Sequence, residues 1–212
     1  MAIRKRLTRR ALFTGAATAV AIGASAGVAL AVAITFTITP GGAITAKAGK
    51  TTLTDKNTGS VLTCASSSSS GTLKKGSGLA GAGIGTLTSA SFTGCAVGAI
   101  SVTVTVHGLP WKLNATSFNA TTGVTSGTIS GIDLVASNPA CNATLDGTAA
   151  GANNGKTKIT YTNSTGKIKL LGPGGNLHSY NVTGCLGLIN NGDAQQASGG
   201  GAVTPKQTIT SP

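Results

Sequence analysis

Apolar and polar residues alternate over much of the chain from residue 34 onwards. The clearest case is the segment 100–106, where Ile and three Val residues alternate with Ser and Thr. An extended strand puts successive side chains on opposite faces, so a period of two is typical of a half-buried antiparallel strand. Helices are not favoured, because Glu is absent and Gln, Arg and Met are scarce. The pattern therefore predicts an all-β fold.

Short turns rich in Gly, Asn and Pro separate the expected strands, as in 40–42 and 153–155. Many short strands with this spacing indicate a β-sandwich or a β-barrel. The length that follows the first 33 residues fits a single antiparallel domain, residues 34–212. The expected strands are 34–39, 43–47, 51–54, 60–65, 72–74, 85–93, 99–107, 111–116, 127–135, 141–147, 156–162, 167–171, 176–182 and 202–209.

Residues 1–33 have the organisation of a cleaved signal peptide. Five basic residues and no acidic residue lie in the first ten positions, and residues 11–33 are uncharged and rich in Ala, Gly, Val and Thr. Ala29, Ala31 and Ala33 provide two small-x-small cleavage sites, after which the period of two begins. An uncleaved membrane anchor is the alternative, but Ala, Gly and Thr partition into hydrocarbon less well than Leu or Ile.

The segment 8–13, Thr-Arg-Arg-Ala-Leu-Phe, resembles a twin-arginine leader, which is the Tat route of export. A general secretory signal needs only the positive charge and the apolar core, so that route stays open. Either route exports the chain. We expect a secreted protein that is extracellular or associated with the cell wall, without membrane attachment once the signal peptide is removed.

The positive charge of the domain comes from lysine alone. Of the sixteen basic residues in the chain, the eleven beyond the leader are all Lys, and with four Asp they leave a net charge of +7. Arg, which reads guanine edges and clamps phosphates, is absent from this part. Specific nucleic-acid binding is therefore not expected, whereas a loose attraction to an anionic cell wall is compatible with the charge.

Four cysteines, Cys64, Cys95, Cys141 and Cys185, lie in the expected exported domain. An even number in an oxidising location predicts two disulfides. Of the three possible pairings we favour Cys64 with Cys95 and Cys141 with Cys185, because each bridge then closes its own half of the domain. Both Cys95 and Cys185 end a similar Thr-Gly-Cys stretch, which agrees with this pairing. A metal site is not expected, because no Cys-x-x-Cys pair is present and there are only two His.

Candidate catalytic groups are few. Catalysis by paired carboxylates would need two of only four Asp residues, and we expect each Asp to lie in a turn. A serine triad would need His107 or His178, and the chain has no Gly-x-Ser-x-Gly elbow. The Gly-rich stretch 81–86 precedes a strand, so we interpret it as a turn and not as a phosphate-binding loop. We therefore expect no enzyme activity, and we assign no catalytic residue, cofactor or metal.

The segment 107–113 contains the only Trp of the chain and is the most distinctive stretch. An exposed Trp beside polar residues stacks on sugar rings, which makes His107 and Trp111 a candidate binding surface. A buried Trp that fills one end of the core is the commoner arrangement, and we favour it for Trp111.

Several stretches spread over the domain carry a resemblance: 62–64, the Gly-rich run 81–85 with Cys95, 110–113, 162–167, 176–193 and 206–212. In these the chain resembles a group of small exported proteins of filamentous actinobacteria (Streptomyces-type) that have no established function. The resemblance implies secretion and an all-β domain, and it implies no catalytic residue. The stretch Gly199-Gly200-Gly201 departs from the group, where a more strand-like sequence would be expected.

These observations favour a secreted, non-enzymatic envelope or extracellular β module. We expect its partner to be a cell-wall polysaccharide or an extracellular protein. A secreted hydrolase that uses His178 or His107 with an Asp is the alternative.

Overall fold

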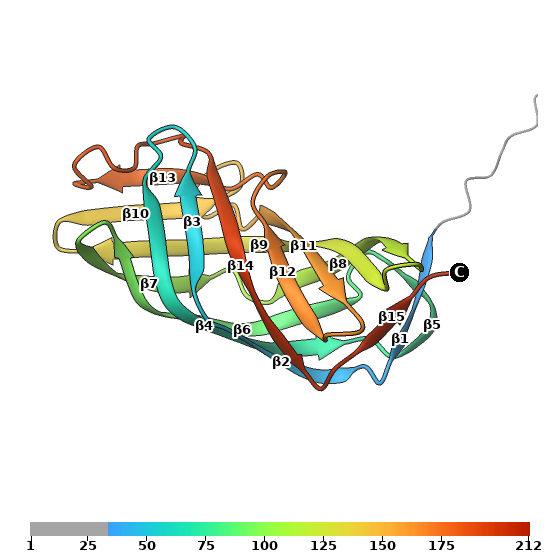
Figure 1. Cartoon of the computed structure of the whole chain (residues 1–212). Coiled ribbons are helices and arrows are strands. Elements are labelled where there is room, and N and C mark those ends of the chain that lie inside the picture. The colour runs from blue at the N-terminus through green and yellow to red at the C-terminus, as the bar shows by residue number, and fades with distance from the viewer. Residues whose placement is uncertain (1–33) are drawn as a thin grey trace, which may run out of the picture. The chain divides into compact units, whose positions relative to one another are not determined.

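The structure is a computed structural model, and it describes residues 34–212. In this part of the chain every helix or strand element is a β-strand, so the prediction of an all-β fold is confirmed (Figure 1). The expected signal peptide lies outside the described residues. The strands are β1 (Thr35–Thr39), β2 (Gly42–Ala48), β3 (Thr51–Asp55), β4 (Val61–Leu73), β5 (Gly76–Ala80), β6 (Gly85–Val97), β7 (Ile100–His107), β8 (Trp111–Asn119), β9 (Val124–Asn138), β10 (Cys141–Asp146), β11 (Gly155–Thr162), β12 (Lys167–Leu171), β13 (His178–Thr183), β14 (Gln195–Thr204) and β15 (Thr208–Thr210).

Eight strands form an antiparallel barrel, which we call the main barrel. Their order is β9-β11-β12-β14-β2-β4-β6-β8, and β8 pairs back onto β9 to close the ring. Of the two architectures that the sequence allows, the structure shows the barrel. Alternate residues point inward and form the larger hydrophobic core, which includes Ile44, Leu87, Leu113, Ile129, Ile159 and Val203.

Four of these strands continue beyond the main barrel. β4, β6 and β9 have 13, 13 and 15 residues, and the first half of β14 extends with them. Here β3, β7, β10 and β13 complete a second arrangement in the order β14-β3-β4-β6-β7-β9-β10-β13. The bridge between His178 and Ala194 joins β13 to the residue before β14. We call this part the disulfide end.

Both disulfides lie in the disulfide end. Cys64–Cys95 joins the neighbouring strands β4 and β6, and Cys141–Cys185 joins β10 to the loop after β13. The predicted pairing is therefore confirmed. The four sulfurs are buried in a second, smaller core with small aliphatic residues, which include Val97, Val102, Ala136 and Ala143.

At two places in the wall, one strand pairs with the long strands in the main barrel and a different strand pairs with them in the disulfide end. Between β14 and β4, β2 pairs in the main barrel and β3 pairs in the disulfide end. Between β6 and β9, β8 and β7 divide the space in the same way. The break between β7 and β8 falls at Gly108, whose φ of 65° favours glycine. A Cβ at this position would lie 2.2 Å from Asn153 Oδ1, so the turn is tightly packed.

A separate three-stranded sheet, β15-β1-β5, lies across the end of the main barrel opposite the disulfides (Figure 1). Its inward side chains Phe36, Ile38 and Ile209 are buried and belong to the larger core. Tyr161 from β11 donates a hydrogen bond to the carbonyl of Gln207 and ties this sheet to the barrel. We call it the end sheet. Within residues 34–212 no helix is long and apolar enough to cross a membrane.

Strand β4 passes straight through the serine run, where the sequence pattern predicts a break between 65 and 72. The outward hydroxyls pair with those of β6 across the sheet: Ser66 with Thr93 at 2.6 Å, Ser68 with Ser91 at 2.8 Å and Ser70 with Ser89 at 2.7 Å. Cross-strand hydroxyl pairs of this kind stabilise a sheet without any apolar alternation.

Candidate ligand cavity

The main barrel encloses a cavity of about 160 Å³ that extends to the start of the disulfide end. Its wall is made by inward side chains from β2, β4, β6, β8, β9, β11, β12 and β14, with contributions from β3, β7 and β10. Aliphatic and aromatic residues dominate it, among them Ile44, Leu53, Leu87, Trp111, Leu113, Ile129, Leu134, Leu145, Ile168 and Leu177. Empty cavities with an apolar wall stay dry and bind apolar molecules. The cavity is therefore the candidate site.

No charged side chain lines the cavity, among the residues that the structure describes. The few polar residues on the wall are Ser and Thr, and Thr51 and Ser67 satisfy one another through a hydrogen bond of 2.9 Å. A carboxylate buried in this cavity would have no cation or strong donor beside it, which costs several kcal/mol. The cavity therefore favours a neutral apolar molecule over a fatty acid.

Two glycines of β14 bring neighbouring strands close together beside the cavity. A Cβ on Gly201 would lie 2.1 Å from the Lys47 carbonyl oxygen, and one on Gly200 would lie 2.5 Å from the Ile168 carbonyl oxygen. Both glycines line the cavity. The Gly-rich stretch therefore forms a regular strand, which pairs with β2 and β12, and any side chain there would push the wall apart.

Trp111 lies in this wall and is buried, with 4% of its surface exposed. Its Nε1 donates a hydrogen bond to the carbonyl of His107 at 3.0 Å. His107, in contrast, is exposed at the end of β7. The two residues are thus adjacent in space, but the ring of Trp111 faces the cavity and the side chain of His107 faces solvent.

The four Asp residues are all buried. Asp55, Asp146 and Asp193 cap loops as turn residues do: Asp146, for example, accepts hydrogen bonds from the amides of Gly147, Asn153, Asn154 and Gly155. Asp133 is different, because it lies in the middle of β9 and not in a turn. The expectation that every Asp occupies a turn is wrong for this residue.

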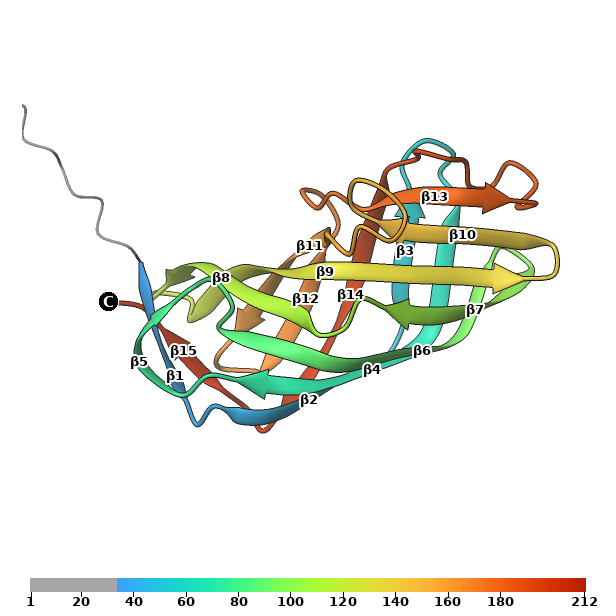
Figure 2. The same cartoon turned by 180° about the vertical axis from the view of Figure 1, so that it is seen from behind.

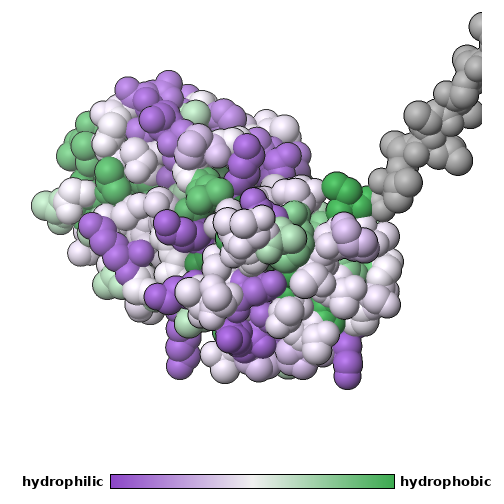
Figure 3. Space-filling model, turned by 45° about the vertical axis from the view of Figure 1, so that its right-hand side comes forward, coloured by the Kyte–Doolittle hydropathy of each residue, from purple (hydrophilic) through white to green (hydrophobic). Residues whose placement is uncertain are grey.

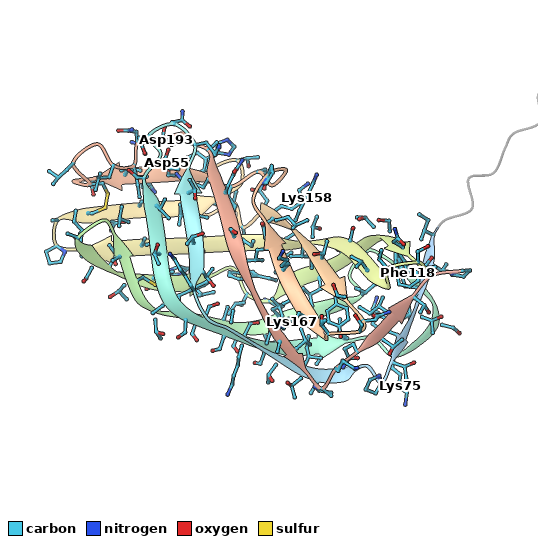
Figure 4. The ribbon with its side chains drawn as sticks, viewed as in Figure 1. Asp55, Lys75, Phe118, Lys158, Lys167 and Asp193 are labelled. Atoms are coloured by element: carbon cyan, nitrogen blue, oxygen red, sulfur yellow. A yellow bond between two sulfur atoms is a disulfide. The ribbon has the colours of Figure 1, made fainter. Side chains whose placement is uncertain are left out.

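A polar network around Asp55 holds the disulfide end together, and Figure 4 shows Asp55 and Asp193 close to one another there. Gln195 Nε2 donates to Asp55 Oδ2 at 2.7 Å, and the amides of Asn57 and Thr58 donate to Oδ1. Burial alone raises the pKa of Asp55, but these hydrogen bonds outweigh it and lower the pKa. The carboxylate is therefore a stabilising anion inside the fold.

Asp133 has the opposite character. Its Oδ1 is buried without a hydrogen-bond partner. Burial raises its pKa, the charge of Asp146 raises it further, and His107, its partner in the β7–β9 register, lowers it. Within residues 34–212 neither His ring is hydrogen-bonded to an Asp, and Nδ1 of His178 lies 2.9 Å from the Asn176 carbonyl. The described residues also contain no group of three or more His, Cys, Asp or Glu that could hold a metal ion.

The charges of the domain are separated by depth. All eleven Lys residues of 34–212 are exposed, whereas the four Asp residues are buried. Figure 4 shows Lys158 and Lys167 on the outer wall and Lys75 at the end of the barrel. On the face drawn in Figure 3, hydrophilic and near-neutral residues alternate, and hydrophobic residues form separate patches.

The cavity is the feature that sequence reasoning misses. Its lining comes from strands spread between residues 44 and 203, and an inward residue beside a cavity has the same period of two as one in a filled core. The one available signal is the surplus of small inward residues, such as Ala46, Ala90 and Ala197. These leave the barrel interior underfilled.

Comparison with protein families gives a match over most of the chain. A family model described as alkane oxidation protein activator PraA/PraB-like matches residues 9–210. Comparison with curated proteins and with solved structures finds no match.

Proposed function

The chain belongs to the family of PraA/PraB-like alkane oxidation protein activators. We propose that it promotes alkane oxidation by binding a neutral hydrocarbon inside its barrel. The apolar cavity is the observation that carries this proposal. A protein that extracts an alkane from the hydrocarbon phase and carries it in water makes that alkane available to a separate oxidising enzyme.

The energetics support a hydrocarbon ligand. Each methylene group that leaves water contributes about 0.8 kcal/mol, and a dry cavity with an apolar wall gains this without losing hydrogen bonds. The wall offers shape and contact area but no charged group. We therefore infer selectivity by polarity, with alkanes bound and alkyl carboxylates rejected.

The proposed role needs no catalysis by this chain, and we propose a non-enzymatic protein that works after export. The two disulfides are consistent with an oxidising, extracellular location. A polysaccharide ligand has less support, because Trp111 is buried and none of the aromatic residues in the described part of the chain is exposed. The cavity favours a hydrocarbon over a glycan.

Equilibrium binding tests the proposal. Diphenylhexatriene, a neutral rod-shaped hydrocarbon that fluoresces in apolar surroundings, should bind the folded protein at one site, and hexadecane should displace it. Hexadecanoate should displace it at least tenfold more weakly at neutral pH. Equal displacement by the carboxylate, or no fluorescence gain at all, would contradict the proposal.

A matched pair of variants places the ligand. Ala197 lines the cavity, and Ala202 lies on the same strand but is exposed. Ala197→Phe should fill part of the cavity and weaken diphenylhexatriene binding about tenfold, whereas Ala202→Phe should leave it unchanged. Equal effects of the two substitutions would place the ligand elsewhere.

A further inference from the structure

The wall of the barrel is interrupted along one line. β6 pairs with β8 through residues 85–87 and with β7 through residues 95–97. Between these two short ladders residues 88–94 of β6 have no partner on this side, and neither have residues 103–107 of β7. In Figure 2 the ribbons of β6 and β7 separate as they run away from the turn that joins them. We call this interruption the fissure.

The fissure lies against the cavity. Ala90 and Phe92 of β6 and Val104 of β7 point inward along its edges, and all three line the cavity. All three residues are only partly buried, although their side chains point towards the interior of the barrel. On the outer side the edges carry small hydroxyl residues, including Ser89, Ser91, Thr103 and Thr105. Seven residues of an extended strand span about 23 Å, so the interruption is long enough for a chain molecule.

Both ends of the barrel are closed by packing. At one end Phe36, Ile38 and Ile209 of the end sheet fill the core with 4% or less of their surface exposed. At the other end the disulfides and the small core occupy the interior, with Cys185 and Ala143 at 1% and 0% exposed. A ligand that used either end would have to separate well-packed apolar side chains.

We infer that the fissure between β6 and β7 is the route by which an apolar chain enters and leaves the cavity, with Phe92 as its gate. This inference rests on the proposed function and adds how the site is reached. Phe92 contacts both the larger and the smaller core, so one rotation of its side chain opens the wall without breaking any strand pairing. Ala90 lines the cavity at the same edge, and its side chain is a single methyl group.

Rates of diphenylhexatriene binding measured by stopped-flow fluorescence test the gate. Phe92→Ala should speed both association and dissociation at least fivefold. Ala90→Phe should slow both at least tenfold. Ala197→Phe is the matched control, because it adds the same side chain to the cavity wall on β14, away from the fissure. It should weaken the affinity through faster dissociation and leave association unchanged.

Equal association rates in Ala90→Phe and Ala197→Phe would overturn the fissure as the route while leaving the cavity as the site. Absence of binding to the wild-type protein would remove the proposed function itself, so the two failures are distinguishable.

Hydrogen exchange gives a test that needs no ligand. Within 88–94 and 103–107, every second amide points across the fissure and should exchange at least a hundredfold faster than its neighbours, which pair with β4 or β9. Uniform protection along β6 would show that the wall is closed in solution and would contradict the inference.

Discussion

The main barrel and the disulfide end share four long strands but differ in how their interiors are filled. In the main barrel, inward side chains from all sides leave a cavity of about 160 Å³. In the disulfide end, small side chains such as Ala136 and Ala143 pack against the two bridges and are almost fully buried. One chain thus combines a loosely filled part, which holds the proposed ligand site, with a part that is cross-linked by two disulfides. The following predictions test this division, beginning with the largest expected effect.

Loss of the Cys141–Cys185 bridge should reduce stability most. The bridge spans 44 residues, for which the chain-entropy model gives about 4 kcal/mol. The Cys141→Ala/Cys185→Ala variant should lower the free energy of unfolding in urea by about this amount. Under conditions where the variant is folded, its affinity for diphenylhexatriene should be unchanged. A large loss of affinity in the folded variant would show that ligand binding also depends on the disulfide end.

Asp55 tests whether the polar network belongs to the stable part. Its pKa is lowered by folding, so it contributes stability above its unfolded pKa and loses it as the pH falls through its folded value. Asp55→Asn should therefore cost about 2–3 kcal/mol at pH 7, since hydrogen bonds to a charged acceptor are lost. The cost should shrink towards pH 3. Urea unfolding at several pH values measures it, and a cost independent of pH would contradict the assignment.

Two alanine-to-leucine substitutions compare the fillings directly. Ala143, fully buried in the disulfide end, should tolerate no extra volume, and Ala143→Leu should destabilise by about 2 kcal/mol. Ala46 lines the cavity, where the added side chain has room. Ala46→Leu should change stability by less than about 1 kcal/mol and weaken diphenylhexatriene binding. Similar destabilisation at both positions would mean that the cavity is filled in solution.

Asp133, which lies between the two parts on β9, should give a small effect of the opposite sign from that of Asp55. Because folding raises its pKa, its favourable contribution is present below the unfolded pKa and is lost as the pH rises through the folded value. Asp133→Asn should therefore stabilise the protein at pH 7 by about 1 kcal/mol, and the gain should disappear towards pH 3. Thermal unfolding across this pH range measures it, and destabilisation at pH 7 would show that the carboxylate has a partner in solution.

The sequence predicts the disulfide end better than the main barrel. The period of two in 100–106 predicts β7, and the spacing of the cysteines predicts both bridges, because these signals are local or paired. The serine run 66–70 gives no apolar alternation, so the continuous strand β4 is visible only once the hydroxyls of β6 are placed opposite. The cavity and the fissure depend on how eight strands close, and no single segment records that. The candidate surface at His107 and Trp111 and the absence of catalysis remain predictions.

The separation of charge by depth makes the domain behave in solution as a polycation. Its carboxylates face inward and its ammonium groups face outward, so copies repel each other even though Leu186 exposes 82% of its surface. At an ionic strength of 0.1 M this repulsion reaches only about 10 Å, and it shortens further as salt is added. The molecules should therefore stay dispersed at low ionic strength, whereas high ionic strength should allow their apolar patches to come into contact.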